Sequence, residues 1–280
     1  VLPKLETPTM KILLKVPIIN DKIKATIREE MIKAFGGNFR EIIVGGAAFN
    51  QEVEQFLKMI DFPYTVGYGM TECGPIICYE DWTRFKLGSC GKAAPRMDVR
   101  VLSSDPENIV GEIVCKGPNV MLGYYKNPEA TAEVIRDGWF YTGDLGYIDD
   151  EGYIVITGRK KNVIITKNGK NVFPEELEYQ LSLFDEIAES MVFEGEAEGK
   201  NDTLIVAGIY PDWAVIKEVL GDKADDDKEV EKYLWTLVDR INDENPGYKM
   251  IKKINLRHHE FEKNTSKKIK RFVEENKKAL

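Results

Sequence analysis

The chain has 280 residues, of which 43% are hydrophobic and 31% charged, and its 39 basic and 47 acidic residues give a formal net charge of −8. This composition is ordinary for a globular protein, and the length predicts a sizeable core divided between two units. The acidic balance argues against general nucleic-acid binding, and the apolar stretches, such as residues 42–49, are far shorter than the ~20 residues of a membrane helix.

The first part of the chain alternates between predicted helices and strands. Apolar residues four apart at Ile23, Ile27 and Met31 predict an amphipathic helix, and Asn50 can cap the next one. The expected elements are a helix at 21–35 ended by glycines, a buried strand at 41–49 that runs into a glycine turn, a helix at 51–60, and a strand followed by a loop at 64–72. This alternation is typical of a sheet with helices packed on it.

From about residue 85 the pattern changes to short strands separated by Gly and Pro turns. One helix interrupts them, with Asn127 as its cap and Pro128 at its first position. Two apolar runs that flank residues 149–152 predict a hairpin. We therefore expect a small antiparallel β subdomain at 85–160.

After residues 158–161 the chain reads as a compact α+β unit. Short strands alternate with a proline-started helix from Pro174 and a helix at 228–244. The acidic run at 222–231 is interpreted as a solvated loop and helix start. The predicted division is a first domain at 1–160, made of a βα part at 1–84 and a β subdomain at 85–160, and a second domain at 161–280.

The amino-terminal residues and the cysteines indicate the cell compartment. Residues 1–15 show neither the apolar core nor the cleavage site of a signal peptide. The four cysteines lack CxxC spacing and a nearby histidine, which argues against a zinc site. We expect reduced thiols in a cytoplasmic protein, and the start at Val1 suggests a truncated chain. Peripheral contact with a membrane stays open.

Residues 67–74, GYGMTECG, form a glycine-rich segment after a predicted strand. Glycines 67 and 69 let the backbone turn sharply and approach a ligand. Thr71 and Glu72 offer hard oxygen atoms that suit Mg²⁺ carried by nucleotide phosphates. The alternative is a plain strand-to-loop turn with polar surface residues.

Two further segments admit a ligand or a plain turn. The small residues at 45–48 would let a flat ring lie against the backbone, or they form only a tight turn. Asp144, in YTGD, could accept hydrogen bonds from two vicinal hydroxyls, as acids do with ribose, or it could make an Asx turn.

Two basic segments complete the pattern. Arg159, in GRKK, suits phosphate or ribose oxygens, although the lysines after it could be an exposed linker. Residues 261–272 are rich in lysine, and the alternative to a site is a solvated basic helix capped by Ser266. Spacing alone does not choose among Lys267, Lys268 and Lys270.

Taken in this order over residues 40–272, these motifs resemble the adenylate-forming, AMP-binding superfamily, which includes acyl-CoA synthetases, firefly-luciferase-like enzymes and peptide-synthetase adenylation domains. VGGAAF, GYGMTE and FEKNTSKKIKR are most similar to bacterial long-chain-fatty-acid–CoA ligases. The resemblance implies an α/β and α+β fold: part of a large adenylating domain followed by a mobile carboxyl-terminal lid domain.

The resemblance also implies roles for residues of the first domain. The backbone of Gly45, Gly46 and Ala47 would border the adenine ring, on which Tyr68 would stack. Gly69 lies in the same nucleotide-binding loop. Thr71 would contact the phosphates, and Glu72 would bind Mg²⁺.

Further roles are implied around the predicted domain boundary and in the lid. Asp144 would hold the ribose hydroxyls, Arg159 would lie near ribose and phosphate, and Lys161 would be the hinge. Asn168 and Gly169 would line the pantetheine tunnel. The lid lysine needed for adenylation would be Lys268.

The resemblance departs from the family pattern in two places. The phosphate loop that precedes these motifs in the family is absent, so we expect the carboxyl-terminal half of a longer enzyme, with its amino-terminal part missing. Lys267 stands where relatives have glycine before the catalytic lysine.

The implied function is ligation of an acid to a thiol. A long-chain fatty acid would be activated by ATP to an acyl-adenylate and then joined to coenzyme A, with release of AMP and pyrophosphate. Two alternatives stay open: another carboxylate substrate (aryl, short-chain or amino acid), or a fragment that binds nucleotide without activity.

Overall fold

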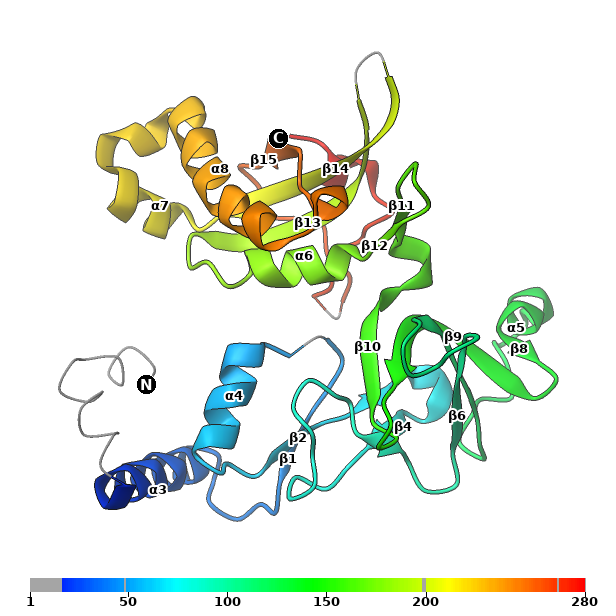
Figure 1. Cartoon of the computed structure of the whole chain (residues 1–280). Coiled ribbons are helices and arrows are strands. Elements are labelled where there is room, and N and C mark those ends of the chain that lie inside the picture. Colours follow the sequence, from blue (N-terminus) through cyan, green and yellow to red (C-terminus); the bar gives the residue numbers. More distant parts are fainter. Residues whose placement is uncertain (1–16, 48, 198–199, 266, 280) are drawn as a thin grey trace. The chain divides into compact units, whose positions relative to one another are not determined.

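The computed structural model describes residues 17–47, 49–197, 200–265 and 267–279 (Figure 1). Its contacts divide the chain into two compact units. The first comprises the described residues up to Thr142 together with Gly146–Ile156, and the second comprises Gly143–Leu145 and the residues from Thr157 onward. The fold is mixed α/β with antiparallel sheets, which confirms the predicted class. The domain boundary at residue 160 stays a prediction.

The βα part of the first unit pairs two short parallel strands with helices. Its elements are α3 (Pro17–Ala34), β1 (Ile42–Val44), α4 (Gln51–Met59) and β2 (Tyr64–Val66). The Asn50 side chain accepts hydrogen bonds from the N–H groups of Glu52 and Val53, so the predicted cap is confirmed. Such a cap commonly stabilises a helix by about 1 kcal/mol. Apolar side chains of α4 and β2, among them Phe56 and Tyr64, form the local core.

The strand β1 differs from the prediction of a buried strand at 41–49. It has only three residues, and Ile43 is 48% exposed. Among the described residues β1 pairs with β2 alone and is an edge strand, whereas a continuous apolar run is typical of a strand buried on both faces. The apolar pattern correctly predicts a strand here, but the prediction that the strand is buried is wrong.

Short antiparallel strands form the rest of the first unit, except that Gly143–Leu145 and Thr157–Arg159, within the last two strands, belong to the second. The elements are β3 (Tyr68–Gly69), η1 (Thr71–Cys73), β4 (Ile76–Tyr79), β5 (Lys92–Ala93), β6 (Asp98–Leu102), β7 (Gly111–Lys116), α5 (Pro128–Val134), β8 (Ile135–Arg136), β9 (Trp139–Ile148) and β10 (Ile154–Arg159). They make one sheet in the order β3-β4-β5 and another in the order β10-β9-β7-β6, with β8 on β9. The predicted hairpin is confirmed, since Asp149 Oδ1 accepts the N–H groups of Glu151 and Tyr153 between β9 and β10.

The second unit is a three-stranded sheet covered by helices. Its elements are η2 (Lys160–Asn162), β11 (Ile164–Ile165), β12 (Asn171–Val172), α6 (Pro174–Leu181), β13 (Ile187–Ala197), β14 (Lys200–Pro211), α7 (Trp213–Leu220), η3 (Gly221–Asp225), α8 (Asp227–Glu244), η4 (Gly247–Lys249), β15 (Lys253–Leu256) and η5 (Glu274–Lys277). The strand β14 lies in the centre, antiparallel to β13 and parallel to β15.

Helices α6 and α8 bury apolar stripes against this sheet. Leu234 and Val238 recur four apart on α8 and are fully buried beside Leu177 of α6. Each such side chain stabilises the fold by about 1.5–3 kcal/mol. Among the described residues, no helix combines the length and the apolar character that crossing a membrane requires.

Candidate functional site

The ends of the parallel strands β1 and β2 bring two predicted segments together in the first unit (Figure 1). The Gly67 N–H donates to the Val44 carbonyl oxygen at 2.8 Å. A Cβ added to Gly45 would lie 3.0 Å from the Gly67 carbonyl oxygen. The turn at 45–47 therefore lies against the start of the segment that carries Tyr68. Carboxyl ends of adjacent parallel strands are where open α/β sheets bind ligands.

The loop after β2 turns back on itself without room for a side chain at Gly69. A Cβ there would lie 2.0 Å from the Pro75 carbonyl oxygen. Tyr68 is 8% exposed and belongs to the apolar cluster of the β subdomain, with Ile77. The absence of a Cβ at position 69 thus fixes the path of the chain from Tyr68 to Thr71, as its glycine content predicted.

Thr71 and Glu72 lie in η1, at the end of this loop. Thr71 is exposed and Glu72 is half-buried. The Tyr124 hydroxyl donates to Glu72 Oε1 at 3.0 Å. Burial and the bond to Glu72 raise the pKa of Tyr124, so it stays a donor to the carboxylate. The Asn119 amide donates to the carbonyl oxygen of Cys73 at 2.6 Å and holds the turn from the other side.

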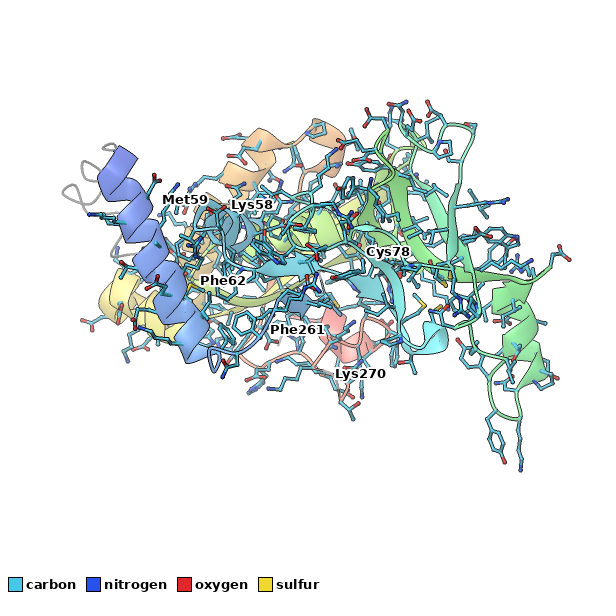
Figure 2. The ribbon with its side chains drawn as sticks, turned by 90° about the horizontal axis from the view of Figure 1, so that it is seen from below. Lys58, Met59, Phe62, Cys78, Phe261 and Lys270 are labelled. Atoms are coloured by element: carbon cyan, nitrogen blue, oxygen red, sulfur yellow. The ribbon has the colours of Figure 1, made fainter. Side chains whose placement is uncertain are left out.

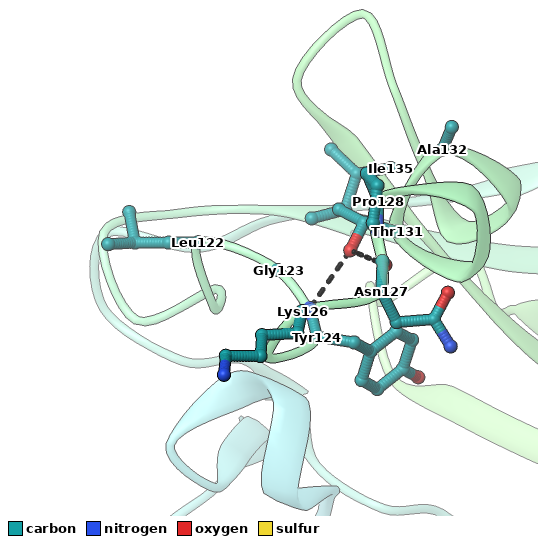
Figure 3. Close-up of a pocket in the computed structure, with 9 residues that line it drawn as sticks. All are labelled: Leu122, Gly123, Tyr124, Lys126, Asn127, Pro128, Thr131, Ala132 and Ile135. Carbon is teal, nitrogen blue, oxygen red and sulfur yellow. Dashed lines mark hydrogen bonds between the residues drawn. The ribbon is translucent and has the colours of Figure 1, made fainter.

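Sequence reasoning missed Tyr124 and Asn119. Both reach η1 from the segment after β7, far along the chain, and no local spacing connects them to Glu72. Figure 3 shows Tyr124 at an open hollow, where its N–H donates to Thr131 Oγ1 at 2.9 Å. The hollow is lined by Leu122, Gly123, Tyr124, Lys126, Asn127, Pro128, Thr131, Ala132 and Ile135. The predicted site residues are not in this lining, but Tyr124 joins the hollow to the Glu72 carboxylate.

Asp144 and Arg159, predicted from separate motifs, form an ion pair. Arg159 Nε lies 2.9 Å from Asp144 Oδ1, and the Asp144 side chain is 7% exposed while that of Arg159 is 61% exposed. Asp144 lies within β9, so the alternative of an Asx turn is wrong. Gly143 before it has φ +71°, a left-handed conformation inside the strand that glycine adopts readily. A fixed carboxylate beside an accessible guanidinium offers both an acceptor and donors to a hydroxylated, anionic ligand.

The predicted hinge Lys161 lies exposed in η2. Its neighbour Asn162 donates from Nδ2 to Glu175 Oε1 at 2.5 Å. A Cβ on Gly158 would lie 2.8 Å from Glu175 Oε2. The carboxylate of Glu175 in α6 therefore packs against the chain on both sides of Lys161, and it is a contact that the sequence did not reveal.

Asn168 and Gly169 occupy the exposed turn between β11 and β12. Gly169 has φ +70°, and its N–H donates to the Thr166 carbonyl oxygen at 2.8 Å. The turn presents both residues at the surface.

Lys268 is exposed on a tight turn and not on a helix, so the alternative of a basic helix over 261–272 is wrong; its proposed cap Ser266 lies outside the described residues. The Asn264 side chain accepts the Lys268 N–H at 2.9 Å, and the Asn264 N–H donates to the Lys268 carbonyl oxygen at 2.9 Å. Lys267 has φ +59°, which a helix does not allow.

The structure separates Lys270 from the other two lysines. The Lys270 ammonium binds the Glu262 carboxylate, whereas Lys267 and Lys268 are both exposed. The left-handed backbone of Lys267 is the conformation that glycine adopts without strain, and the resemblance expects glycine at this position.

Three comparisons show which known proteins the chain is similar to. Residues 7–125 match the AMP-binding enzyme family. Long-chain-fatty-acid–CoA ligase FadD15 of Mycobacterium bovis is 37% identical over 159 residues, which are 57% of this chain and 26% of the ligase. The 2-succinylbenzoate–CoA ligase of Listeria innocua is 33% identical over 207 residues, which are 71% of this chain and 42% of that ligase.

The solved structure of O-succinylbenzoate coenzyme A synthetase (MenE) from Bacillus subtilis, in complex with ATP and magnesium ion, has a similar fold. The TM-score is 0.67 at 25% identity, and the match covers 86% of this chain and 49% of MenE. The chain thus spans less than half of the length of each of these relatives.

Proposed function

Because the chain carries a domain of the AMP-binding enzyme family, we propose that it takes part in the ATP-dependent ligation of a carboxylic acid to coenzyme A. The observation that supports this best is the Asp144–Arg159 pair, in which groups predicted separately for ribose and phosphate lie 2.9 Å apart. The proposal includes a cytoplasmic location, where the thiol of coenzyme A stays reduced.

The proposed acid is a long-chain fatty acid, on the 37% identity to the mycobacterial ligase. An aryl acid of the 2-succinylbenzoate type is the second candidate, because a ligase of that name is matched over a larger share of this chain. Pyrophosphate exchange by the enzyme with a panel of fatty and aryl acids separates the two. Exchange with aryl acids alone would remove the fatty-acid proposal.

The proposed reaction has two steps. The carboxylate attacks the α-phosphorus of ATP and pyrophosphate leaves, and the thiol of coenzyme A then attacks the acyl-adenylate and AMP leaves. Glu72 has the hard carboxylate oxygens that suit Mg²⁺, which would offset phosphate charge when bound. The turn at 45–47, Tyr68 and Gly69 would border adenine.

The remaining predicted residues act around these steps in the proposal. Thr71 would donate its hydroxyl to a phosphate oxygen. Asn168 and Gly169 would line the path of the thiol. Lys161 would be the hinge about which the second domain rotates, so that the Asn168–Gly169 turn replaces Lys268 at the nucleotide.

Lys268→Ala should slow adenylation about 10²–10³-fold, by analogy with the loss of one positioned oxyanion-hole donor, which costs about that much in rate. Thioester formation from supplied acyl-adenylate should persist. Pyrophosphate exchange and thioester release measure the two halves separately. Lys217→Ala, an exposed lysine of α7, is the control. An equal loss in both half-reactions would contradict the role of Lys268.

Asp144→Ala should raise the KM for ATP more than the KM for the acid, since the carboxylate would hold the ribose hydroxyls. Calorimetry of the chain with ATP and with AMP tests the same contact by binding alone. If the unmodified chain binds AMP and Asp144→Ala binds it equally well, the ribose assignment is wrong. Binding without any exchange activity would favour the alternative of an inactive nucleotide-binding chain.

A further inference from the structure

The two legs of the turn that carries Lys268 are bonded to one buried side chain, that of Asn276. Asn276 is 1% exposed. Its Oδ1 accepts the Glu262 N–H at 2.8 Å, and its Nδ2 donates to the carbonyl oxygens of Glu262 and Lys270, each at 3.0 Å. The Lys270 N–H donates to the Glu262 carbonyl oxygen at 2.9 Å and closes the base of the turn. Figure 2 labels Lys270 of this base and Phe261, which directly precedes Glu262.

From this base a short ladder leads to Lys268. Lys263 and Ile269 pair as an isolated antiparallel bridge. The next rung joins Asn264 and Lys268, through the Asn264 N–H to the Lys268 carbonyl oxygen and the Lys268 N–H to Asn264 Oδ1, each 2.9 Å. The position of the Lys268 backbone therefore depends on these successive pairs keeping the two sides of the turn in register.

Asn276 is itself tied to the core sheet. It belongs to η5, whose Lys277 carbonyl oxygen accepts Asn255 Nδ2 of β15 at 2.7 Å. The buried Arg257, directly after β15, donates from Nη1 to the Glu275 carbonyl oxygen at 2.8 Å. Strand β15 thus holds η5, and η5 holds the turn through the Asn276 amide.

We propose that Asn276 is a positioning residue for adenylation, which acts by fixing the turn that presents Lys268. This inference rests on the proposed function, in which Lys268 approaches the nucleotide phosphates. Lys268 is exposed and its side chain is long, so its approach depends on where the backbone starts. A displacement of about 1 Å in a positioned group can slow a reaction about a hundredfold.

Asn276→Asp tests the proposal with almost no change of size. The variant keeps an acceptor for the Glu262 N–H but loses the N–H donors, and it sets a carboxylate against two carbonyl oxygens. Asn242 provides a matched control. Its side chain is buried, donates to the Ile251 carbonyl oxygen at 2.9 Å and accepts the Ile251 N–H at 2.8 Å. Asn242→Asp therefore loses a similar buried amide on α8, outside the Lys268 turn.

Asn276→Asp should slow adenylation about ten- to a hundredfold and leave thioester formation from supplied acyl-adenylate unchanged. Asn242→Asp should lower Tm to a similar extent and leave both half-reactions unchanged. In a Lys268→Ala background, Asn276→Asp should cause no further loss of adenylation. A similar loss in both half-reactions, a similar loss in the control, or an additive loss in the double variant would overturn the proposal.

Hydrogen exchange on the chain itself supplies a measurement that does not need activity. The amides of Asn264 and Lys268 should exchange faster in Asn276→Asp and at the native rate in Asn242→Asp. Native exchange in Asn276→Asp would overturn the positioning role. If Lys268→Ala adenylates normally, the proposed function fails, and exchange still decides whether Asn276 holds the turn.

Discussion

The loops that carry predicted site residues in the two units are held in place in different ways. In the first unit, a Cβ on Gly69 would lie 2.0 Å from the Pro75 carbonyl oxygen, so the loop takes its path because a side chain is missing. In the second unit, Lys267 adopts a left-handed backbone with φ +59°, while the amides of Asn264 and Asn276 hold the turn around it. A glycine loop is fixed by what one residue lacks, and an amide-bonded turn is fixed by side chains elsewhere in the chain.

Gly69→Ala should give the largest effect and sharpen the first half of this contrast. The new Cβ would also lie 2.8 Å from the Pro75 carbonyl carbon, and backbone atoms cannot rotate away. We expect the free energy of unfolding to fall by about 4 kcal/mol and nucleotide binding to be lost. Chemical denaturation and calorimetry with AMP measure these two quantities.

The control for this change is Gly247→Ala. A Cβ at Gly247 would meet nothing within 4 Å, so its effect should stay within about 0.5 kcal/mol. If Gly69→Ala were as stable as Gly247→Ala, the loop would not owe its path to the missing side chain, and the contrast between the two units would break.

The difference between the loops also explains what the sequence could predict. Local signals were reliable: Asn50 and Asn127 cap their helices, and the hairpin after β9 lies where its turn residues predicted it. Glycine at position 69 lies in the sharp turn that it predicted, while the predicted approach to a ligand stays a prediction. Each of these signals depends on a few adjacent residues, and such signals are readable without the fold.

Contacts between distant residues could not be predicted in the same way. Nothing in YTGD shows that Asp144 lies within a strand and faces Arg159, because that depends on the register of two strands. The lysine-rich sequence at 261–272 is compatible with a helix. In the structure it forms a turn instead, in which the Asn264 side chain accepts the Lys268 N–H. The role of Asn276 depends on β15 and η5 meeting, which only the tertiary structure reveals.

The next largest effect should be a pH dependence of the unfolding free energy, and it should arise in the second unit. Glu178 of α6 accepts the Val192 N–H at 2.6 Å and pairs with Arg271, which follows the Lys268 turn. Burial raises the pKa of Glu178 from 4.5 to about 7, with Glu175 adding to the rise and Arg271 opposing it. The folded state therefore binds the Glu178 proton more tightly than the unfolded state does.

The stabilisation from this proton is complete below pH 4.5 and is lost as the pH rises through about 7. The shift corresponds to about 3 kcal/mol. Glu178→Gln should remove this part of the pH dependence, so the difference in unfolding free energy between native chain and variant should change across pH 4.5–7. Denaturation at several pH values measures it. Parallel curves for the two proteins would show that Glu178 does not titrate in this range.

Lys267→Gly should have the smallest effect and tests the second half of the contrast. A left-handed backbone costs a non-glycine residue about 1–2 kcal/mol, but glycine adds about 0.4–1 kcal/mol of entropy to the unfolded chain. We expect a net gain of about 0.5 kcal/mol. Lys126 also has a left-handed backbone, with φ +53°, so Lys126→Gly is the matched control and should gain as much.

The activity of Lys267→Gly decides what sets the turn. If the amides of Asn264 and Asn276 hold it, adenylation should match that of the native enzyme, since the hydrogen bonds of the Lys268 backbone do not involve the Lys267 side chain. A clear change in adenylation, with normal stability, would mean that the residue at position 267 itself controls Lys268. The second turn would then depend on the identity of one residue, as the first depends on Gly69, and the contrast between the two units would no longer hold.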